Sequence, residues 1–408
     1  MTTQAPPFKK LSVCIVGGGV AAIEAALALS DLAPEQTDVT VIAPNSEFVY
    51  RPMTVVEPFA FGGARHYPLA PIVADAGAKL LVDELSWIEP KKNTLHTKGE
   101  EAIVYDALIL ALGARAHPRY SHGTTIDDRR LDETLHGLIQ DVEGGYIHSM
   151  AFVSPGRMAW PLPLYELALM TAGRAYDTQA ELATTIVTPE DSPLAIFGQG
   201  ASDTVSELLQ RANVQTITSA YAEVPEANEV VINPGNRRLK VDRVVALPEL
   251  YGPGVRGIPL GENGFIPVDQ HGHVREVKGP IYAAGDAIDF PIKQGGLGAQ
   301  QADAAAESVA ALAGAAVTPK PFDPVIHAKL LTYDQPLYLT AQISGGHGFS
   351  SEASHTPTWS PPSKIAALYL APYLDELDKA ADAAKDTGAP RQAVEVPDGA
   401  IQTAGVSV

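Results

Sequence analysis

The sequence holds a single cysteine, Cys14, among 408 residues. One cysteine excludes an intrachain disulfide and a metal centre built on several thiolates. Because Cys14 lies inside the apolar run LSVCIV, we expect a small buried hydrophobic side chain. The eleven histidines lack the spacing of metal ligands, so no metal site is predicted. A chain without disulfides is expected in the cytoplasm.

Basic side chains are also scarce. Lys and Arg number 29 against 48 Asp and Glu, which gives a net charge of −19. Such a surface repels phosphate backbones, which argues against nucleic-acid binding. The stretch KKLSVCIVGGGVAAIEAALAL begins like a signal peptide or membrane span, but Glu24 and three consecutive glycines interrupt it. We therefore interpret it as part of a globular fold.

Alternating strand and helix patterns run through the first part of the chain. An apolar strand at 11–16 is followed by a glycine turn, an alanine-rich helix to about residue 31 and a second strand at 38–44. This βαβ pattern predicts a parallel sheet covered by helices. After a turn-rich stretch near residue 120 the pattern restarts, with these expected elements: strands at 150–155, 180–190, 193–198 and 214–219, and helices at 162–177 and 203–212.

The motif Gly17-x-Gly19-x-x-Ala22 directly follows the first strand and opens the helix. Gly17 permits a tight turn, Gly19 lets a diphosphate approach the backbone, and Ala22 lets the helix pack on the strand. No side chain from Gly17 to Ile23 can hydrogen-bond, so the first helical N–H groups lack a local partner that a diphosphate would supply. The carboxylate that usually ends the second strand is missing, and Asn45 is the polar candidate there.

Four further stretches complete a recognisable pattern: EFVYRPM, YDALILALGA, IYAAGD and PIKQGGLGAQQADAAA. With the glycine motif, they resemble FAD-dependent flavoproteins of the pyridine-nucleotide-disulfide-oxidoreductase type, in particular the group of sulfide:quinone reductase, flavocytochrome c sulfide dehydrogenase and type II NADH dehydrogenase. The resemblance covers roughly residues 10–373. It implies FAD bound without a covalent link.

The resemblance also implies individual roles. The cofactor-binding set that it implies is Gly17, Gly19, Ala22, Asn45, Tyr50, Arg51, Pro52, Leu85, Gly113, Gly285 and Asp286. Asp286 would bind the ribityl chain, and residues 50–52 would line the isoalloxazine. Lys293, Gln300 and Gln301 are the expected catalytic side chains, because a cation and a helix start beside the ring stabilise the charge of reduced flavin. Ordinary surface positions for these three are the alternative.

The architecture that follows is α/β, with two Rossmann-like, three-layer dinucleotide-binding domains and a small C-terminal α+β module. The FAD-binding domain is expected to be discontinuous, at 8–118 and 275–318. An NAD(P)-binding-like domain is expected at 145–272 and the C-terminal module at 321–374. Because no aromatic residue follows Tyr373, the acidic stretch 375–408 is predicted to be disordered.

A second glycine loop, Gly198-x-Gly200, leaves two interpretations open. After an apolar run and before a helix, it predicts a phosphate site for NAD(P)H. However, Asp203 places negative charge beside any diphosphate, and Thr204-x-x-Glu207 fits a capping box that satisfies the helix start by itself. The loop is therefore either a nicotinamide nucleotide site or a loop impaired for phosphate.

The leading hypothesis is an FAD-dependent oxidoreductase that passes two electrons from a reductant, NAD(P)H by default, to a quinone or another small acceptor. Sulfide-oxidising relatives work through paired cysteines, which this sequence lacks. The alternatives are an FAD-binding, redox-responsive partner protein and a flavoenzyme that holds an organic substrate at the segment WPLPLYE. The partners expected are a small-molecule donor and acceptor. The stretch SKIAALYLAPYLDEL is interpreted as a packing or homodimer helix, with a membrane surface as the alternative.

Overall fold

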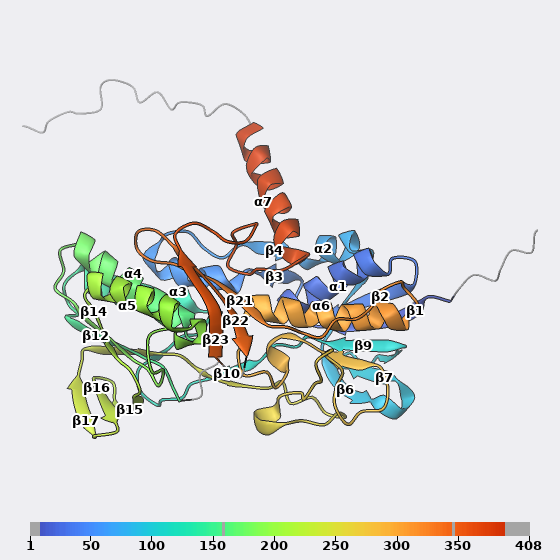
Figure 1. Ribbon diagram of the computed structural model, residues 1–408, viewed down its shortest axis with the longest axis horizontal. Coiled ribbons are helices and arrows are strands. Elements are labelled where there is room, and N and C mark those ends of the chain that lie inside the picture. Colours follow the sequence, from blue (N-terminus) through green and yellow to red (C-terminus); the bar gives the residue numbers. More distant parts are fainter. Residues whose placement is uncertain (1–8, 157–159, 345–346, 388–408) are drawn as a thin grey trace, which may run out of the picture. The chain divides into compact units, whose positions relative to one another are not determined.

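The computed structural model describes residues 9–156, 160–344 and 347–387 (Figure 1). The chain divides into two compact units, residues 1–372 and 373–408, and each is described by itself. The first unit contains two five-stranded parallel sheets with helices and several smaller antiparallel sheets. This confirms the predicted α/β class with two Rossmann-like domains.

The first parallel sheet has the strand order β20-β9-β1-β2-β5. Its strands are β1 (Leu11–Val16), β2 (Thr37–Ala43), β5 (Lys79–Val82), β9 (Ala107–Leu110) and β20 (Ile281–Ala283). Strands β9 and β20 are neighbours in the sheet although the whole second sheet lies between them in sequence. The order places β1 in the centre, as in dinucleotide-binding folds.

Three helices belong to this sheet: α1 (Val20–Leu32), α2 (Leu69–Asp75) and α6 (Gly295–Leu312). Helices α1 and α6 lie side by side (Figure 1). Their buried faces consist largely of alanine, for example Ala25 and Ala305, both fully buried. Such small side chains let the two helix backbones approach closely.

The second parallel sheet has the order β11-β18-β12-β13-β14. Its strands are β11 (Thr124–Thr125), β12 (Ser149–Val153), β13 (Ala183–Val187), β14 (Val214–Ile217) and β18 (Arg243–Ala246). The helices associated with it are α3 (Leu131–Glu143), α4 (Leu162–Asp177) and α5 (Gln199–Arg211). Again the first strand of the βαβ series, β12, lies in the centre.

One predicted strand, at 193–198, is wrong. The segment forms a loop with a short 3₁₀ helix at Ala195–Phe197. Helix α5 begins at Gln199, earlier than predicted, and no side chain caps its start. Thr204 lies inside the helix, where its hydroxyl donates to the carbonyl oxygen of Gly200 at 3.1 Å, so the expected capping box is also wrong.

Antiparallel strands form the remaining sheets of the first unit. They are β3 (Glu47–Val49) with β4 (His66–Pro68), β6 (Leu85–Glu89) with β7 (Thr94–Thr97) and β8 (Ala102–Val104), β10 (Arg115–His117) with β19 (Glu249–Tyr251), β15 (Tyr221–Glu226) with β16 (Glu229–Asn233) and β17 (Arg237–Lys240), and β21 (Val325–Leu330) with β22 (Leu337–Ser344) and β23 (His347–Ser354). The last of these sheets packs against α5 and the 3₁₀ helix at 195–197.

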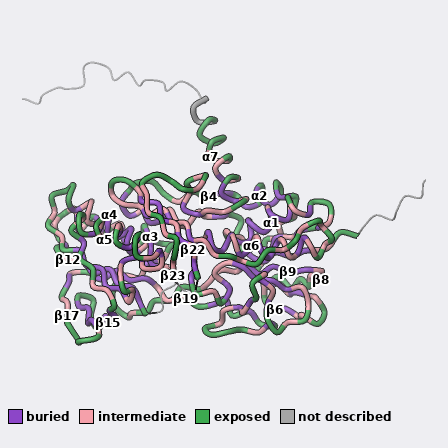
Figure 2. Tube along the Cα trace, viewed as in Figure 1, coloured by how far each residue is buried: buried purple, intermediate pink, exposed green. Residues whose placement is uncertain are grey.

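The central strands of both parallel sheets are buried (Figure 2). Cys14 lies in this core in β1, with 1% of its surface exposed, which confirms its predicted hydrophobic role. Burial raises the pKa of the Cys14 thiol to about 12. Because the thiolate is the nucleophile, this cysteine is chemically inert.

Helix α7 (Leu370–Thr387) runs across the boundary between the two units. Its residues from 375 onward were expected to be disordered, and the structure shows them as helix to Thr387. The Lys379 ammonium lies 2.6 Å from the Asp375 carboxylate one turn earlier, and alanines favour the helix. The rest of the predicted tail, 388–408, lies outside the described residues. Within the described chain, no helix combines the length and the apolar character needed to cross a bilayer.

Candidate functional site

Three loops meet at the carboxyl edge of the first parallel sheet. They follow β1, β9 and β20, and hydrogen bonds between neighbouring strands hold them together: Ala111 N–H donates to the Val16 oxygen at 2.8 Å, and Ala284 N–H donates to the Leu110 oxygen at 3.0 Å. In open parallel sheets this edge is where ligands bind. The sequence-predicted cofactor residues Gly17, Gly113 and Gly285 therefore lie on adjacent loops.

The turn after β1 requires glycine at one position and leaves open space at another. Gly17 has φ +139°, and a Cβ there would lie 2.1 Å from the Ala111 oxygen. A Cβ at Gly19 would meet nothing within 4 Å. Gly19 is the N-cap of α1, no side chain caps this helix, and Ala22 is fully buried one turn on. The N–H groups at the start of α1 therefore face an open space that suits an anion.

The loops after β9 and β20 border the same edge. Gly113 has φ +70° and, like Gly19, open space where a Cβ would lie. Gly285 has φ +75°, and a Cβ there would lie 3.0 Å from the Cβ of Ala21 in α1. The half-buried Asp286 carboxylate has no hydrogen-bond partner among the described residues. Burial raises the pKa of Asp286 to about 6, against the opposing effect of the Lys293 ammonium.

Lys293 is a buried lysine, so the alternative of a surface position is wrong. Only 7% of it is exposed. Its ammonium donates to the Ile288 oxygen and lies 4.0 Å from the centre of the Phe265 ring. Burial lowers the pKa of Lys293 to about 8, while the carboxylates of Asp286 and Asp289 act to raise it. Lys293 thus supplies a positive charge to the loop that carries Asp286.

Gln300 and Gln301 hydrogen-bond to the backbone rather than to solvent. The Gln301 side-chain oxygen accepts the Gly285 N–H at 2.9 Å. The Gln300 amide spans to β21, where it donates to the Val325 oxygen at 2.8 Å and accepts the Val325 N–H at 3.0 Å. Gln301 therefore supports the loop of Asp286, and Gln300 fixes α6 to the C-terminal sheet.

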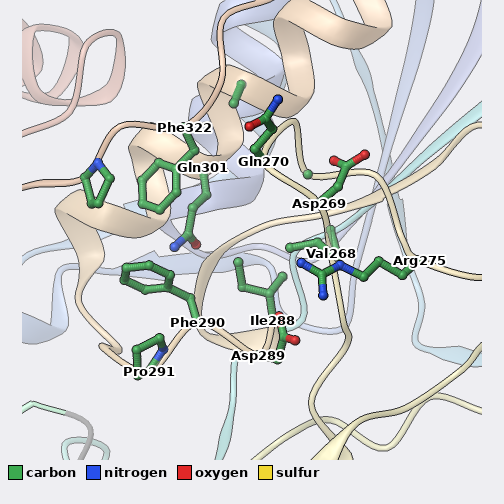
Figure 3. A pocket seen from close by; sticks show the side chains of 14 residues that line it. Val268, Asp269, Gln270, Arg275, Ile288, Asp289, Phe290, Pro291, Gln301 and Phe322 are labelled. Carbon is green, nitrogen blue, oxygen red and sulfur yellow. The ribbon is translucent and has the colours of Figure 1, made fainter. Parts of the chain in front are cut away.

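A pocket of about 330 Å³ borders the Gln301 side chain (Figure 3). Phe290 and Phe322 lie against it with their ring centres 5.2 Å apart, edge to face. Arg275 and Asp289 line it as well (Figure 3). Gln301 both lines this pocket and accepts the hydrogen bond from the Gly285 N–H. A molecule in the pocket would therefore lie next to the side chain that holds the loop of Gly285.

Tyr50, Arg51 and Pro52 lead from β3 into the 3₁₀ helix Arg51–Phe59. The Tyr50 hydroxyl accepts the Ile365 N–H at 2.9 Å, and the Pro52 oxygen accepts the Lys364 ammonium at 2.9 Å. These contacts bring the C-terminal part of the first unit against the stretch expected to line the isoalloxazine.

The sequence analysis missed a buried ion pair at this place. The Lys364 ammonium lies 2.8 Å from the carboxylate of Glu166, which is fully buried in α4 and also accepts the Leu331 N–H at 2.8 Å. Burial raises the pKa of Glu166 and lowers that of Lys364, and each charge opposes the change in the other. The signal available was one lysine within an apolar run near the chain end, but its partner lies 198 positions away.

The second glycine loop differs from the first. Gly198 has φ +83°, and a Cβ there would lie 2.9 Å from the Gly348 oxygen of β23. A Cβ at Gly348 would lie 2.2 Å from the Ile196 oxygen, so β23 packs directly on this loop. The loop also follows β13, the strand after β12 in sequence, instead of the central β12. Gly198 therefore lacks the open space seen at Gly19, whereas a Cβ at Gly200 would only touch the Ser351 hydroxyl oxygen at 3.9 Å.

The carboxylate missing from the predicted nucleotide site of the second domain has a candidate in Glu190. It follows β13 directly and accepts hydrogen bonds from the Tyr165 hydroxyl at 2.7 Å and the Thr188 hydroxyl at 3.0 Å. Burial raises the pKa of Glu190 to about 7. Because 193–198 forms a loop and not a strand, the strand that precedes the second glycine loop is β13, and Glu190 lies three residues after its end.

The two remaining predicted cofactor residues lie beyond the ends of β2 and β5. Asn45 is exposed two residues after β2, and Leu85 opens β6 and is partly exposed. Strand β2 is parallel to β1 and β5 is parallel to β2, so Asn45 and Leu85 lie at the same carboxyl edge of the sheet as Gly17. Residues 157–159, which follow the central strand of the second sheet, lie outside the described residues.

Comparison with known proteins finds similarity to several oxidoreductases. Residues 11–144 match the family described as pyridine nucleotide-disulphide oxidoreductase. A curated relative, the sulfide-quinone reductase of Aquifex aeolicus, is 24% identical over 260 residues, which are 60% of this chain and 59% of that protein. The chain thus spans less than two thirds of this relative. The predicted resemblance is confirmed.

Solved structures support the same fold. The sulfide:quinone oxidoreductase from Aquifex aeolicus has a TM-score of 0.74 at 18% identity, covering 92% of this chain and 91% of that one. The NDH2 of Plasmodium falciparum in complex with NADH has a TM-score of 0.55 at 16% identity, covering 69% and 65%. At these identities the likeness establishes the fold.

Proposed function

We propose that this protein is an FAD-dependent oxidoreductase that passes two electrons from a reductant, NAD(P)H by default, to a quinone or another small acceptor. The observation that carries the proposal is the open, uncapped start of α1 at Gly19. A dinucleotide diphosphate suits this space, because it accepts N–H donors and is attracted to the positive end of the helix.

The residues around this space fit FAD. Gly17, Gly19, Ala22 and Gly113 would hold the diphosphate, and the unpartnered Asp286 carboxylate would accept hydroxyl groups of the ribityl chain. When bound, FAD supplies two-electron redox chemistry. FAD is the cofactor of the flavoproteins that the sequence resembles, and the family match covers the glycine motif. We retain the roles assigned to the other site residues and the domain boundaries as part of the proposal.

The chain's own charged side chains would tune and protonate the site. Lys293, buried beside Asp286, favours negative charge in its surroundings. Reduction of a quinone by two electrons also takes up two protons, which the protein must deliver. The Lys364 ammonium, paired with Glu166 and bonded to Pro52, is a buried proton donor next to the stretch expected to line the ring. We assign it this role.

Two observations bear on the identity of the electron donor. NADH appears in the description of one structural neighbour, which supports a nicotinamide donor. The cover of Gly198 by β23 supports the alternative, a degenerate nicotinamide site with another substrate or a redox partner. The sulfide named for the curated relative is disfavoured here, because the chain has one cysteine, and that one is buried.

The purified protein is expected to show flavin absorbance bands and, under argon, to lose them on mixing with NADH or NADPH. Stopped-flow absorbance identifies which nucleotide reduces the flavin and measures the rate of that reduction. Bleaching by dithionite but by neither nucleotide would remove NAD(P)H as donor and leave the alternative. A colourless protein that does not bind added FAD would refute the proposal itself.

A further inference from the structure

Helices α1 and α6 lie side by side (Figure 1), and each contributes one carboxyl group to an interacting pair. Glu24 of α1 is fully buried, and its carboxyl group and that of Asp303 in α6 act on each other's pKa. The Oδ1 atom of Asp303 is buried and has no partner among the described residues. Two neighbouring carboxyl groups that are shielded from water would repel each other strongly if both were charged, so this arrangement costs free energy that another interaction must offset.

That interaction involves the segment 364–370, which we call the strap. Glu24 accepts the N–H groups of Tyr369 at 2.9 Å and Leu370 at 2.6 Å. At the other end of the strap, Lys364 and Ile365 bond to Glu166, Pro52 and Tyr50. The strap is thus fixed at one end by the acid pair and at the other by the proposed redox site.

We propose that Glu24 and Asp303 are positioning residues, and that a proton held between their carboxyl groups keeps the strap attached and Lys364 in place. The attachment itself is a property of the fold, whereas its effect on turnover rests on the proposed function. The protonated Asp303 donates to Glu24, and the Glu24 carboxylate remains free to accept the strap N–H groups.

The surroundings of the pair favour retention of the proton. Burial raises the pKa of Asp303 to about 8, and the charges of Glu24 and Glu307 add to this effect. Burial also raises the pKa of Glu24, although the strap N–H groups oppose it. Tyr369 of the strap faces the pair and donates to Asp31 at 3.3 Å. The ionisable groups found to act on the pair are thus acids and a tyrosine.

The sign of the pH dependence follows from these shifts. With the strap detached, both carboxyl groups reach water and return to a pKa of about 4. The attached state therefore binds a proton more tightly than the detached state. Attachment weakens as pH rises from about 4 to about 8, by up to about tenfold per pH unit, and changes little above that.

Hydrogen exchange of the strap amides, read by mass spectrometry on the full chain with its bound cofactor, tests this proposal. Asp303→Asn keeps a hydrogen-bond donor but cannot titrate. The ratio of wild-type to Asp303→Asn exchange rates is expected to rise at least about tenfold from pH 6 to pH 8. The intrinsic pH dependence of exchange cancels in this ratio. A constant ratio would overturn the proposal.

Two further variants separate this mechanism from a general loss of structure. Glu24→Gln removes the acceptor charge and is expected to speed strap exchange at every pH. Asp132→Asn changes an exposed carboxylate on α3 and is expected to leave strap exchange unchanged. If donor reduction is observed, its pH profile should flatten above pH 7 in Asp303→Asn. If strap exchange follows the predicted ratio but no donor reduces the flavin, the proposed function alone is contradicted. If strap exchange is unchanged in Glu24→Gln, the proposal that Glu24 holds the strap is contradicted.

Discussion

Replacement of Gly19 by aspartate is expected to weaken FAD binding strongly while the protein stays folded. Gly19 has φ −99° and ψ −170°, a conformation open to any residue, and nothing lies within 4 Å of a Cβ placed there. It is also the N-cap of α1, a position that aspartate favours. The new carboxylate would bond to the same helical N–H groups that a diphosphate needs and would repel its charge.

In Gly19→Asp the stability of the apoprotein is expected to rise, whereas its affinity for FAD is expected to fall. Capping of α1 stabilises the apoprotein by about a few tenths of a kcal/mol, because glycine is itself a tolerated N-cap, and the gain is seen as a slightly higher denaturant midpoint. FAD affinity falls by at least about 100-fold, or about 2.7 kcal/mol, because a donor set and an electrostatic attraction are lost together. Flavin fluorescence titration of the apoprotein measures the second change.

Two variants serve as controls for Gly19→Asp. Gly19→Ala adds only a methyl group and should weaken FAD binding by a smaller factor. Gly137→Asp adds the same charge at an exposed position of α3, where a Cβ also meets nothing within 4 Å, and should leave FAD binding unchanged. Full FAD affinity in Gly19→Asp would show that the diphosphate lies elsewhere.

The first sheet was predictable because its signals are local. The strand at 11–16, the glycine turn and the alanine-rich helix follow one another, and each is fixed by its own residues. The loop at 193–198 shows the opposite case. Its apolar residues resemble a strand, but Phe197 is buried in the core of the second domain as part of a 3₁₀ helix. Apolar content alone does not separate these two outcomes.

The pairs that complete the candidate site could not be predicted in this way. Glu166 and Lys364 lie 198 positions apart, and Glu24 bonds to the N–H group of Leu370 over 346 positions. Each of these charged side chains resembles an ordinary surface residue in sequence, and only packing removes it from water. The sequence thus identifies the glycine loop proposed to hold a dinucleotide, whereas the ionisable groups near the candidate site become neighbours only in the tertiary structure.

The buried ion pair gives the largest expected effect on stability. Lys364→Met leaves the fully buried Glu166 without its cation, and the expected loss of unfolding free energy is about 3–5 kcal/mol at pH 7. The loss should shrink as pH falls, because burial raises the pKa of Glu166 and the unpaired acid can take up a proton. Urea unfolding of both proteins at pH 7 and pH 5 measures this difference.

A double variant distinguishes the loss of charge balance from the loss of packing. Glu166→Gln in the Lys364→Met background removes the unpaired charge and keeps an acceptor for the Leu331 N–H, so much of the stability should return. The matched control is Lys79→Met, which breaks an exposed pair with Asp38 at 3.0 Å and should cost less than about 1 kcal/mol. Equal losses for Lys364→Met and the double variant would mean that the unpaired charge of Glu166 is not the cause of the loss, and that the lysine stabilises this region through its hydrogen bond to Pro52.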